Sequence, residues 1–106
     1  MKLKNKKRLL DELAKESENP KEFIQNVMAL QHQTAENLTQ NVSMTPQHFY
    51  VVMNQLGKGK SLGVKTCTKI AQGLDINPIT LYRVVADYCI TQYLNSIENN
   101  GIHQNT

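Results

Sequence analysis

The sequence predicts an all-helical domain. Each of the three prolines follows a residue that can cap a helix, in the pairs Asn19-Pro20, Thr45-Pro46 and Asn77-Pro78. Proline suits the first helical position, because its missing N–H would have no partner there in any case. Between these points apolar residues recur every three or four positions, and no stretch alternates as a strand does. We therefore expect several short helices and no sheet.

Composition narrows the class of protein. A chain of 106 residues is long enough for one hydrophobic core and too short for two. No apolar run approaches the ~20 residues that span a bilayer, and the basic start turns acidic where a signal peptide would be apolar. We expect a cytoplasmic protein. Cys67 and Cys89 lack metal-site spacing, so we expect buried free thiols, with no metal and no cofactor.

Capping residues and apolar spacing place six helices in order. Asn19 marks the second helix, and Glu22 stands where a capping box places a carboxylate. Thr34 marks the third, and the glycine-rich basic stretch 57–63 interrupts the helical pattern between the fourth and the fifth. The first helix is basic. The helices are expected near residues 5–17, 20–32, 34–42, 45–56, 64–74 and 78–97.

Positive charge gathers in two blocks. Residues 1–8 carry five cations, and residues 58–83 carry five cations against one acid. A polyanionic partner requires such clusters. For the first block, a solvated N-terminal arm is an equally simple explanation.

The helix expected at 45–56 has two different faces. The first face is apolar and is expected to be buried in the core; it holds Phe49, Val52, Met53 and Leu56. The second stays free and holds Gln47, Tyr50, Val51 and Asn54. An exposed tyrosine beside an exposed valine on a polar face indicates a contact surface. Because only Ser43 and Met44 join this helix to the one before it, the two must cross steeply, as in a helix-turn-helix.

The stretch TAENLTQNVSMTPQHFYVVMNQ resembles the Cro and phage-repressor family of helix-turn-helix domains, the xenobiotic-response-element type. Its apolar positions are held by Leu38, Val42, Met44, Phe49 and Val52, and Thr45 stands at the usual cap. Downstream, KIAQGLDINPITLY is similar to the family's fourth and fifth helices. The likeness covers 23–82, about three-fifths of the chain. Thr39, Ser43 and a longer loop around GKGKSLG depart from the pattern, and Ser43 would be strained in a left-handed backbone.

The resemblance implies a DNA-binding face. The residues implied to contact DNA are Thr34, Thr45, Pro46, Gln47, Tyr50, Val51, Asn54, Lys58 and Lys60. Gln47 would pair with adenine and Val51 would meet a thymine methyl, while Tyr50 would contact the backbone. Thr34 and Thr45, at helix starts, and the lysines suit phosphate oxygens. The segment 1–8 would follow the DNA backbone or enter a minor groove.

Simpler explanations stand beside these assignments. Gln47 and Asn54 are also ordinary surface residues in an amide-rich chain, and the three histidines share no spacing. GKGKSLG is not preceded by a strand, as a phosphate-binding loop would be, and no Ser, His and carboxylate set is present. We therefore expect no enzyme and no catalytic residue.

The last helix carries two apolar stripes on different sides. Leu81, Val84, Val85 and Tyr88 form the first, and the second holds Ile90, Tyr93, Leu94 and Ile97. One core does not need both, so either the helix folds back near Cys89 or its second stripe meets another subunit. We expect the second, a homodimer whose two modules read a palindrome. The leucines and alanine of residues 9–14 either join that interface or pack on their own domain.

The sequence thus predicts a five-helix repressor-like helix-turn-helix domain with a basic N-terminal helix or arm and an extended C-terminal helix. Its parts are a basic arm (1–19), the DNA-binding domain (20–86), a dimerising extension (87–98) and a disordered tail (99–106). The expected function is a DNA-binding transcriptional regulator, a repressor, bound to double-stranded DNA as a homodimer. The alternative is a protein-interaction module of the same fold, an antitoxin or adaptor with little specific DNA binding.

Overall fold

The computed structural model describes residues 3–104, with side chains from 6 to 98. Over that range the chain is helical and contains no strand, which confirms the predicted all-helical class. The helices are α1 (Leu3–Glu16), α2 (Pro20–Leu30), α3 (Ala35–Gln40), α4 (Pro46–Gly57), α5 (Val64–Gly73) and α6 (Pro78–Gln104).

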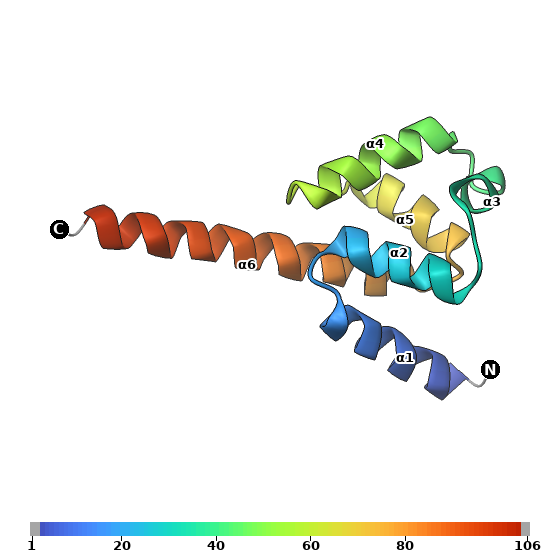
Figure 1. Cartoon of the computed structure of the whole chain (residues 1–106), viewed down its shortest axis with the longest axis horizontal. Coiled ribbons are helices and arrows are strands. Elements are labelled where there is room, and N and C mark those ends of the chain that lie inside the picture. The colour runs from blue at the N-terminus through green and yellow to red at the C-terminus, as the bar shows by residue number, and fades with distance from the viewer. Residues whose placement is uncertain (1–2, 105–106) are drawn as a thin grey trace.

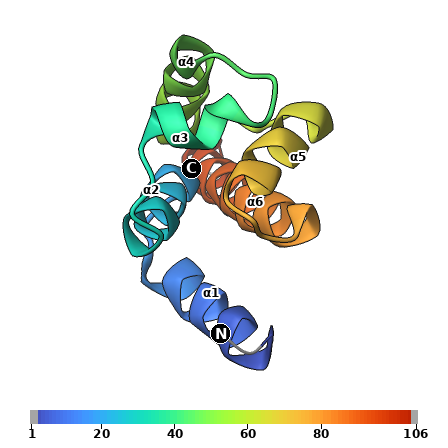
Figure 2. The same cartoon turned by 90° about the vertical axis from the view of Figure 1, so that its right-hand side faces the viewer.

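Four of the helices gather beside the first half of α6, and α1 packs against one of them, α2. Figure 1 shows α2, α3, α4 and α5 gathered at one end of α6, whose second half then runs out alone. The described chain measures 53 × 32 × 20 Å, and the long dimension follows α6. In Figure 2, which looks roughly along α6, α4 lies at one side of the domain and α1 at the other.

The core draws on every helix of this cluster. Its most deeply buried large side chains are Phe23, Ile24, Leu38, Leu56, Ile70, Leu74 and Leu81. Each such side chain contributes about 1.5–3 kcal/mol when it leaves water. From α1, Leu10 is buried and Leu13 packs against the same core. The apolar residues of α1 therefore cover their own domain, which decides between the two alternatives left open for that helix.

The predicted capping residues start their helices. The side-chain oxygen of Asn19 accepts a hydrogen bond from the N–H of Glu22 at 2.9 Å. Thr34 accepts from the N–H of Asn37 at 3.2 Å, and Asn77 accepts from the N–H of Ile79 at 2.8 Å. Each bond satisfies one of the N–H groups that the first helical turn leaves without a partner.

The helices α1, α2, α3 and α5 end one or two residues earlier than predicted, whereas α4 ends one residue later than predicted. α2, α4 and α5 are each closed by a left-handed residue: His32 at φ 54°, Gly59 at φ 83° and Asp75 at φ 54°. After α2, for example, the N–H of Gln33 donates to the carbonyl oxygen of Met28 at 2.9 Å. Such a turn satisfies the last carbonyls, and glycine usually makes it. Histidine and aspartate give no such signal in the sequence.

The last helix is longer than predicted. α6 continues to Gln104, so residues 99–104 of the expected disordered tail are helical, and 105–106 lie outside the described residues. Each added residue of an established helix gains one backbone hydrogen bond, and a glycine such as Gly101 costs only about 1 kcal/mol. The helix does not fold back near Cys89. No helix in the described range is long and apolar enough to cross a membrane.

Candidate nucleic-acid interface

The predicted pair of helices, α3 and α4, is joined by a tight turn. Ser43 lies in it at φ 53°, the left-handed conformation that a serine adopts only at a cost. The ammonium of Lys69 on α5 donates to the carbonyl oxygen of Ser43 at 3.3 Å. Lys69 is therefore engaged at the turn.

The two faces of α4 are as predicted. Phe49, Val52, Met53 and Leu56 are buried, whereas Gln47, Tyr50, Val51 and Asn54 are exposed. Tyr50 is 56% exposed and Val51 is 54% exposed. The Tyr50 ring meets the buried Phe49 ring edge to face, with centroids 6.1 Å apart, which supports its position. The exposed face thus combines amide groups with apolar surface.

The start of α4 points its free N–H groups to the surface. The Thr45 hydroxyl oxygen accepts from the N–H of His48 at 3.1 Å, and both residues are exposed. Pro46 follows at the first helical position and is half-buried. Because this end of the helix carries the positive end of its dipole, an anion is favoured there. Pro46 itself offers no N–H.

Thr34 is less available for a ligand than the sequence indicates. Its hydroxyl accepts from the N–H of Asn37 and also donates to the Asn37 side-chain oxygen at 2.9 Å. Its own N–H donates to the same oxygen at 3.3 Å. A phosphate could bind the Thr34 hydroxyl only by replacing Asn37, because a hydroxyl has a single proton to donate.

A shallow groove of about 280 Å³ runs between α2 and α4, beside the exposed face. Tyr50 and Asn54 line it from α4, while Lys21 and Gln25 line it from α2. The Lys21 stem lies against the end of α4, where a Cβ added to Gly57 would stand 3.2 Å from Lys21 Cδ. Sequence reasoning missed Lys21 and Gln25, because the spacing within α2 does not show which helix they face.

Two predicted lysines follow α4 directly. Lys58 and Lys60 are exposed on either side of Gly59. The N–H of Lys60 donates to the carbonyl oxygen of Gln55 at 3.0 Å, which fixes the turn to the helix. Together with Lys21, these residues place cations at the C-terminal end of α4.

The described part of the basic N-terminal segment, from Leu3, lies elsewhere, and residues 1–2 lie outside the described residues. Lys6 forms an ion pair with Asp75 at 3.3 Å, and Arg8 pairs with Glu12 at 3.4 Å. Figures 1 and 2 both show α1 across the domain from α4. Lys6 thus fastens α1 to the connection between α5 and α6, and a straight duplex lying on the free face of α4 would not reach it.

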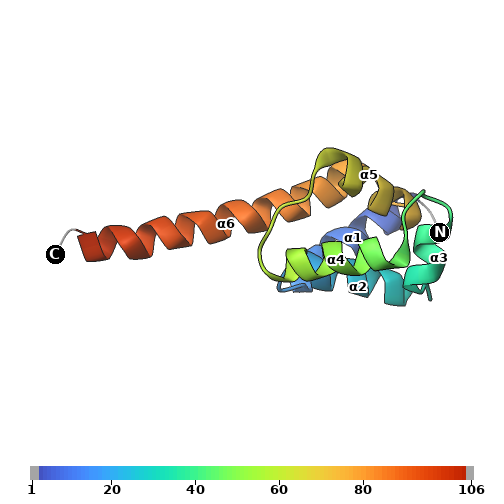
Figure 3. The same cartoon turned by 90° about the horizontal axis from the view of Figure 1, so that it is seen from above.

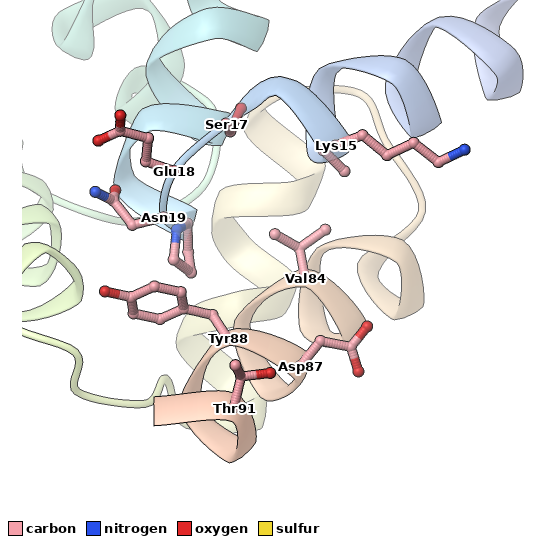
Figure 4. A pocket seen from close by; sticks show the side chains of 10 residues that line it. Lys15, Ser17, Glu18, Asn19, Val84, Asp87, Tyr88 and Thr91 are labelled. Atoms are coloured by element: carbon pink, nitrogen blue, oxygen red, sulfur yellow. The ribbon is translucent and has the colours of Figure 1, made fainter. Parts of the chain in front are cut away.

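A second hollow, of about 340 Å³, opens between the start of α2 and α6. Figure 4 shows the Tyr88 ring reaching toward Asn19, while the ends of Lys15 and Asp87 point away from it. Its charged residues do not converge on one point. We find no arrangement of acid, base or nucleophile in it that would support catalysis.

The two cysteines are free thiols. Cys67 is buried as predicted, at 1% exposed, whereas Cys89 is only half-buried, with its Sγ 3.6 Å from the carbonyl oxygen of Gly59. Burial raises the pKa of the Cys67 thiol, because the ionised form loses its water. Cys67 therefore behaves as a small apolar core residue.

The predicted dimerisation residues all lie on the free half of α6. Tyr93 is 66% exposed, and the other three are about half exposed: Ile90, Leu94 and Ile97. Figure 3 shows the second half of α6 running away from α4 and the rest of the domain. The structure thus presents two separate exposed surfaces: a mixed amide and apolar face on α4 with cations at its C-terminal end, and an apolar face on the second half of α6. No protein-family model, curated protein or solved structure matches the chain.

Proposed function

We propose that the chain is a sequence-specific DNA-binding transcriptional regulator that acts as a repressor, with α4 in the major groove of an operator. The observation that carries this proposal is the free face of α4. It begins at an open helix start, displays Gln47, Tyr50, Val51 and Asn54, and is preceded by the tight turn that holds α3 across it.

The chemistry of that face suits base edges. An amide side chain such as Gln47 or Asn54 both donates and accepts, as adenine requires in the major groove. Val51 offers the apolar contact that a thymine methyl accepts. The Tyr50 hydroxyl suits the sugar-phosphate backbone, since such contacts orient a protein without reading sequence.

Cations at the C-terminal end of this face suit phosphates. Lys58 and Lys60 follow α4, and Lys21 reaches the same end from α2. The start of α4, with Thr45, suits a phosphate through its N–H groups. Each neutralised phosphate releases counterions, so binding should weaken steeply as salt rises. In this proposal α1 makes no contact with the duplex that α4 reads.

The regulator acts as a homodimer in this proposal. One module presents one short reading helix, and two modules related by a two-fold axis read two half-sites about 34–36 Å apart. The exposed apolar residues of α6 supply the surface for association. A dimer bound at a promoter excludes other proteins without further contacts, which is why repression is the simpler outcome.

The second candidate is a protein-interaction module, an antitoxin or adaptor. Tyr50 and Val51 favour it, because more than half of each side chain is exposed and both are residues that protein interfaces bury well. This candidate requires no sequence-selective contact with DNA.

A gel shift with genomic fragments at about 0.15 M salt tests the proposal. A DNA-binding regulator should retain a few fragments far more tightly than the rest, typically by 10³-fold or more, and release them as salt rises. Equal, weak retention of all fragments would favour the protein-interaction module.

A further inference from the structure

The apolar surface of α6 extends further along the helix than its free end. Ile79 is 61% exposed and Tyr82 is 42% exposed, although both lie where α6 packs on the domain. The residues that share this outer face are Ile79, Tyr82, Ala86, Ile90, Tyr93, Leu94 and Ile97. At 1.5 Å per residue the stripe is ~27 Å long. It lies opposite the core-facing residues Leu81 and Val85.

The spacing of this stripe is that of a two-stranded coiled coil. Ile79, Ala86, Ile90, Tyr93 and Ile97 occupy alternating positions of a heptad, with Arg83 at the one charged position in the series. A helix with this seam is suited to pack against another helix of the same pattern. A second copy of this chain provides one.

Charge decides how two copies of α6 would align. Arg83 lies near the start of the stripe and Glu98 near its end, both exposed, and neither forms an ion pair among the side chains that the structure describes. In a parallel pair, Arg83 would face Arg83 of the second copy across the seam. In an antiparallel pair, each Arg83 would lie within two residues, ~3 Å along the axis, of Glu98 of the second copy, on the same side of the seam.

The position of α4 leads to the same alignment. In Figure 2 α4 lies to one side of α6, in the direction away from α1. A parallel pair has its two-fold axis along α6, which would turn the second α4 to the opposite side of the dimer. An antiparallel pair has its axis perpendicular to α6, which keeps both α4 helices on one side, where a single duplex can meet both.

We propose that two copies of the chain associate through antiparallel α6 helices. In this register Ile97 packs beside Ala86 of the second copy and Ile90 beside Tyr93. Arg83 then lies two residues, ~3 Å along the axis, from Glu98 of the second copy, within reach of an ion pair at each end. The argument from α4 rests on the proposed DNA-binding function, whereas the arguments from heptad spacing and charge do not.

Disulfide trapping tests the alignment in the full chain. Cys89→Ser removes the half-buried thiol, and Cys67 stays because it is buried. In that background two variants are made, Ala86→Cys and Ile97→Cys. Each variant is oxidised alone, and an equimolar mixture of the two is refolded together and then oxidised. A disulfide needs Cα atoms about 5.5–6 Å apart. In the antiparallel dimer, position 97 of one copy lies ~16 Å along the axis from position 97 of the other, but beside position 86 of the other. Only the mixture should therefore cross-link, and each cross-linked dimer should contain one chain of each variant.

Two results would overturn the proposal. Efficient cross-linking of each variant with itself would show a parallel pair and leave the proposed function standing. A sedimenting monomer at micromolar concentration for the unmodified chain would show that α6 does not pair, whatever DNA the chain binds. Loss of DNA selectivity with the mixed cross-link intact would instead count against the proposed function alone.

Charge exchange gives a second readout that leaves the seam unchanged. Arg83→Glu and Glu98→Arg should each weaken self-association, by about tenfold, because each creates two like-charged contacts. The double variant Arg83→Glu/Glu98→Arg should recover the original affinity. In a parallel pair Arg83→Glu merely exchanges one repulsion for another, so an unchanged dissociation constant for that variant would contradict the antiparallel alignment.

Discussion

Gly73 on α5 lies directly against Leu38 on α3. A Cβ on Gly73 would stand 2.8 Å from Leu38 Cδ2 and 2.9 Å from the Leu38 carbonyl oxygen, closer than non-bonded atoms approach. The neighbouring backbone is tied as well, because the Gln31 amide donates to the carbonyl oxygen of Leu74 at 2.6 Å and the Gln33 amide to that of Gly73 at 3.2 Å. α5 therefore fixes the position of α3, and through it the turn before α4.

The first prediction concerns this contact. Gly73→Ala should lower the free energy of unfolding by about 1–3 kcal/mol, because a backbone atom cannot move aside as a side chain can. Urea denaturation measures the change. Gly63→Ser is the control, since a Cβ there meets nothing within 4 Å and serine is a good capping residue. It should leave stability unchanged or raise it. An equal loss in both variants would contradict the close packing of α5 on α3.

The second prediction concerns the start of α4. Thr45→Ala removes the acceptor for the N–H of His48 and should cost about 1 kcal/mol of stability. Thr45→Ser retains the oxygen and should lose much less. Thermal or urea denaturation of the unmodified chain, Thr45→Ala and Thr45→Ser measures these differences in stability. Equal stability of the alanine and serine variants would show that the hydroxyl does not cap the helix.

The third prediction concerns the cations beside α4. Lys58→Ala should weaken binding to all duplexes about equally and reduce the slope of log affinity against log salt by about 1. Lys15→Ala is the matched control, because Lys15 is exposed on α1, across the domain from α4. It should leave the slope unchanged. The slopes come from fluorescence anisotropy at several salt concentrations, and similar slopes for the two variants would remove Lys58 from the interface.

The fourth prediction concerns pH. Burial raises the pKa of the Cys67 thiol, so the folded chain holds that proton more tightly than the unfolded chain does. The resulting stability is present below the unfolded pKa of about 8.5 and is lost as pH rises through the folded value. The loss between pH 7 and pH 10 should therefore be smaller in Cys67→Ala than in the unmodified chain, with Cys89→Ala as the control. If Cys67→Ala lost as much stability between pH 7 and pH 10 as the unmodified chain, the prediction would be contradicted.

Much of the fold follows from local signals in the sequence. Asn19, Thr34 and Thr45 are capping residues whose role depends on the next three positions, and the two faces of α4 depend only on helical spacing. These features were predictable because their causes lie within one or two turns of the chain. The same holds for the apolar stripe of α6.

Other features depend on contacts between distant segments. The ion pair between Lys6 and Asp75 joins residues 69 positions apart, and Lys21 reaches the end of α4 only through the packing of α2. His32 and Asp75 adopt left-handed conformations that packing stabilises and that their residue types do not require. The sequence left open whether the basic N-terminal segment contacts DNA or is a solvated arm, because its charge pattern does not show that α1 lies across the domain from α4.

The central claim is that the free face of α4 reads bases. Selection from a random duplex pool, followed by anisotropy at about 0.15 M salt, gives the ratio of affinities for the selected and a scrambled duplex. For the unmodified chain that ratio should be about 10³ or more. Gln47→Ala or Asn54→Ala should lower the free energy of discrimination between the two duplexes by about 1–3 kcal/mol, mainly by weakening binding to the selected duplex. Equal loss on both duplexes, or a ratio near one for the unmodified chain, would contradict the claim.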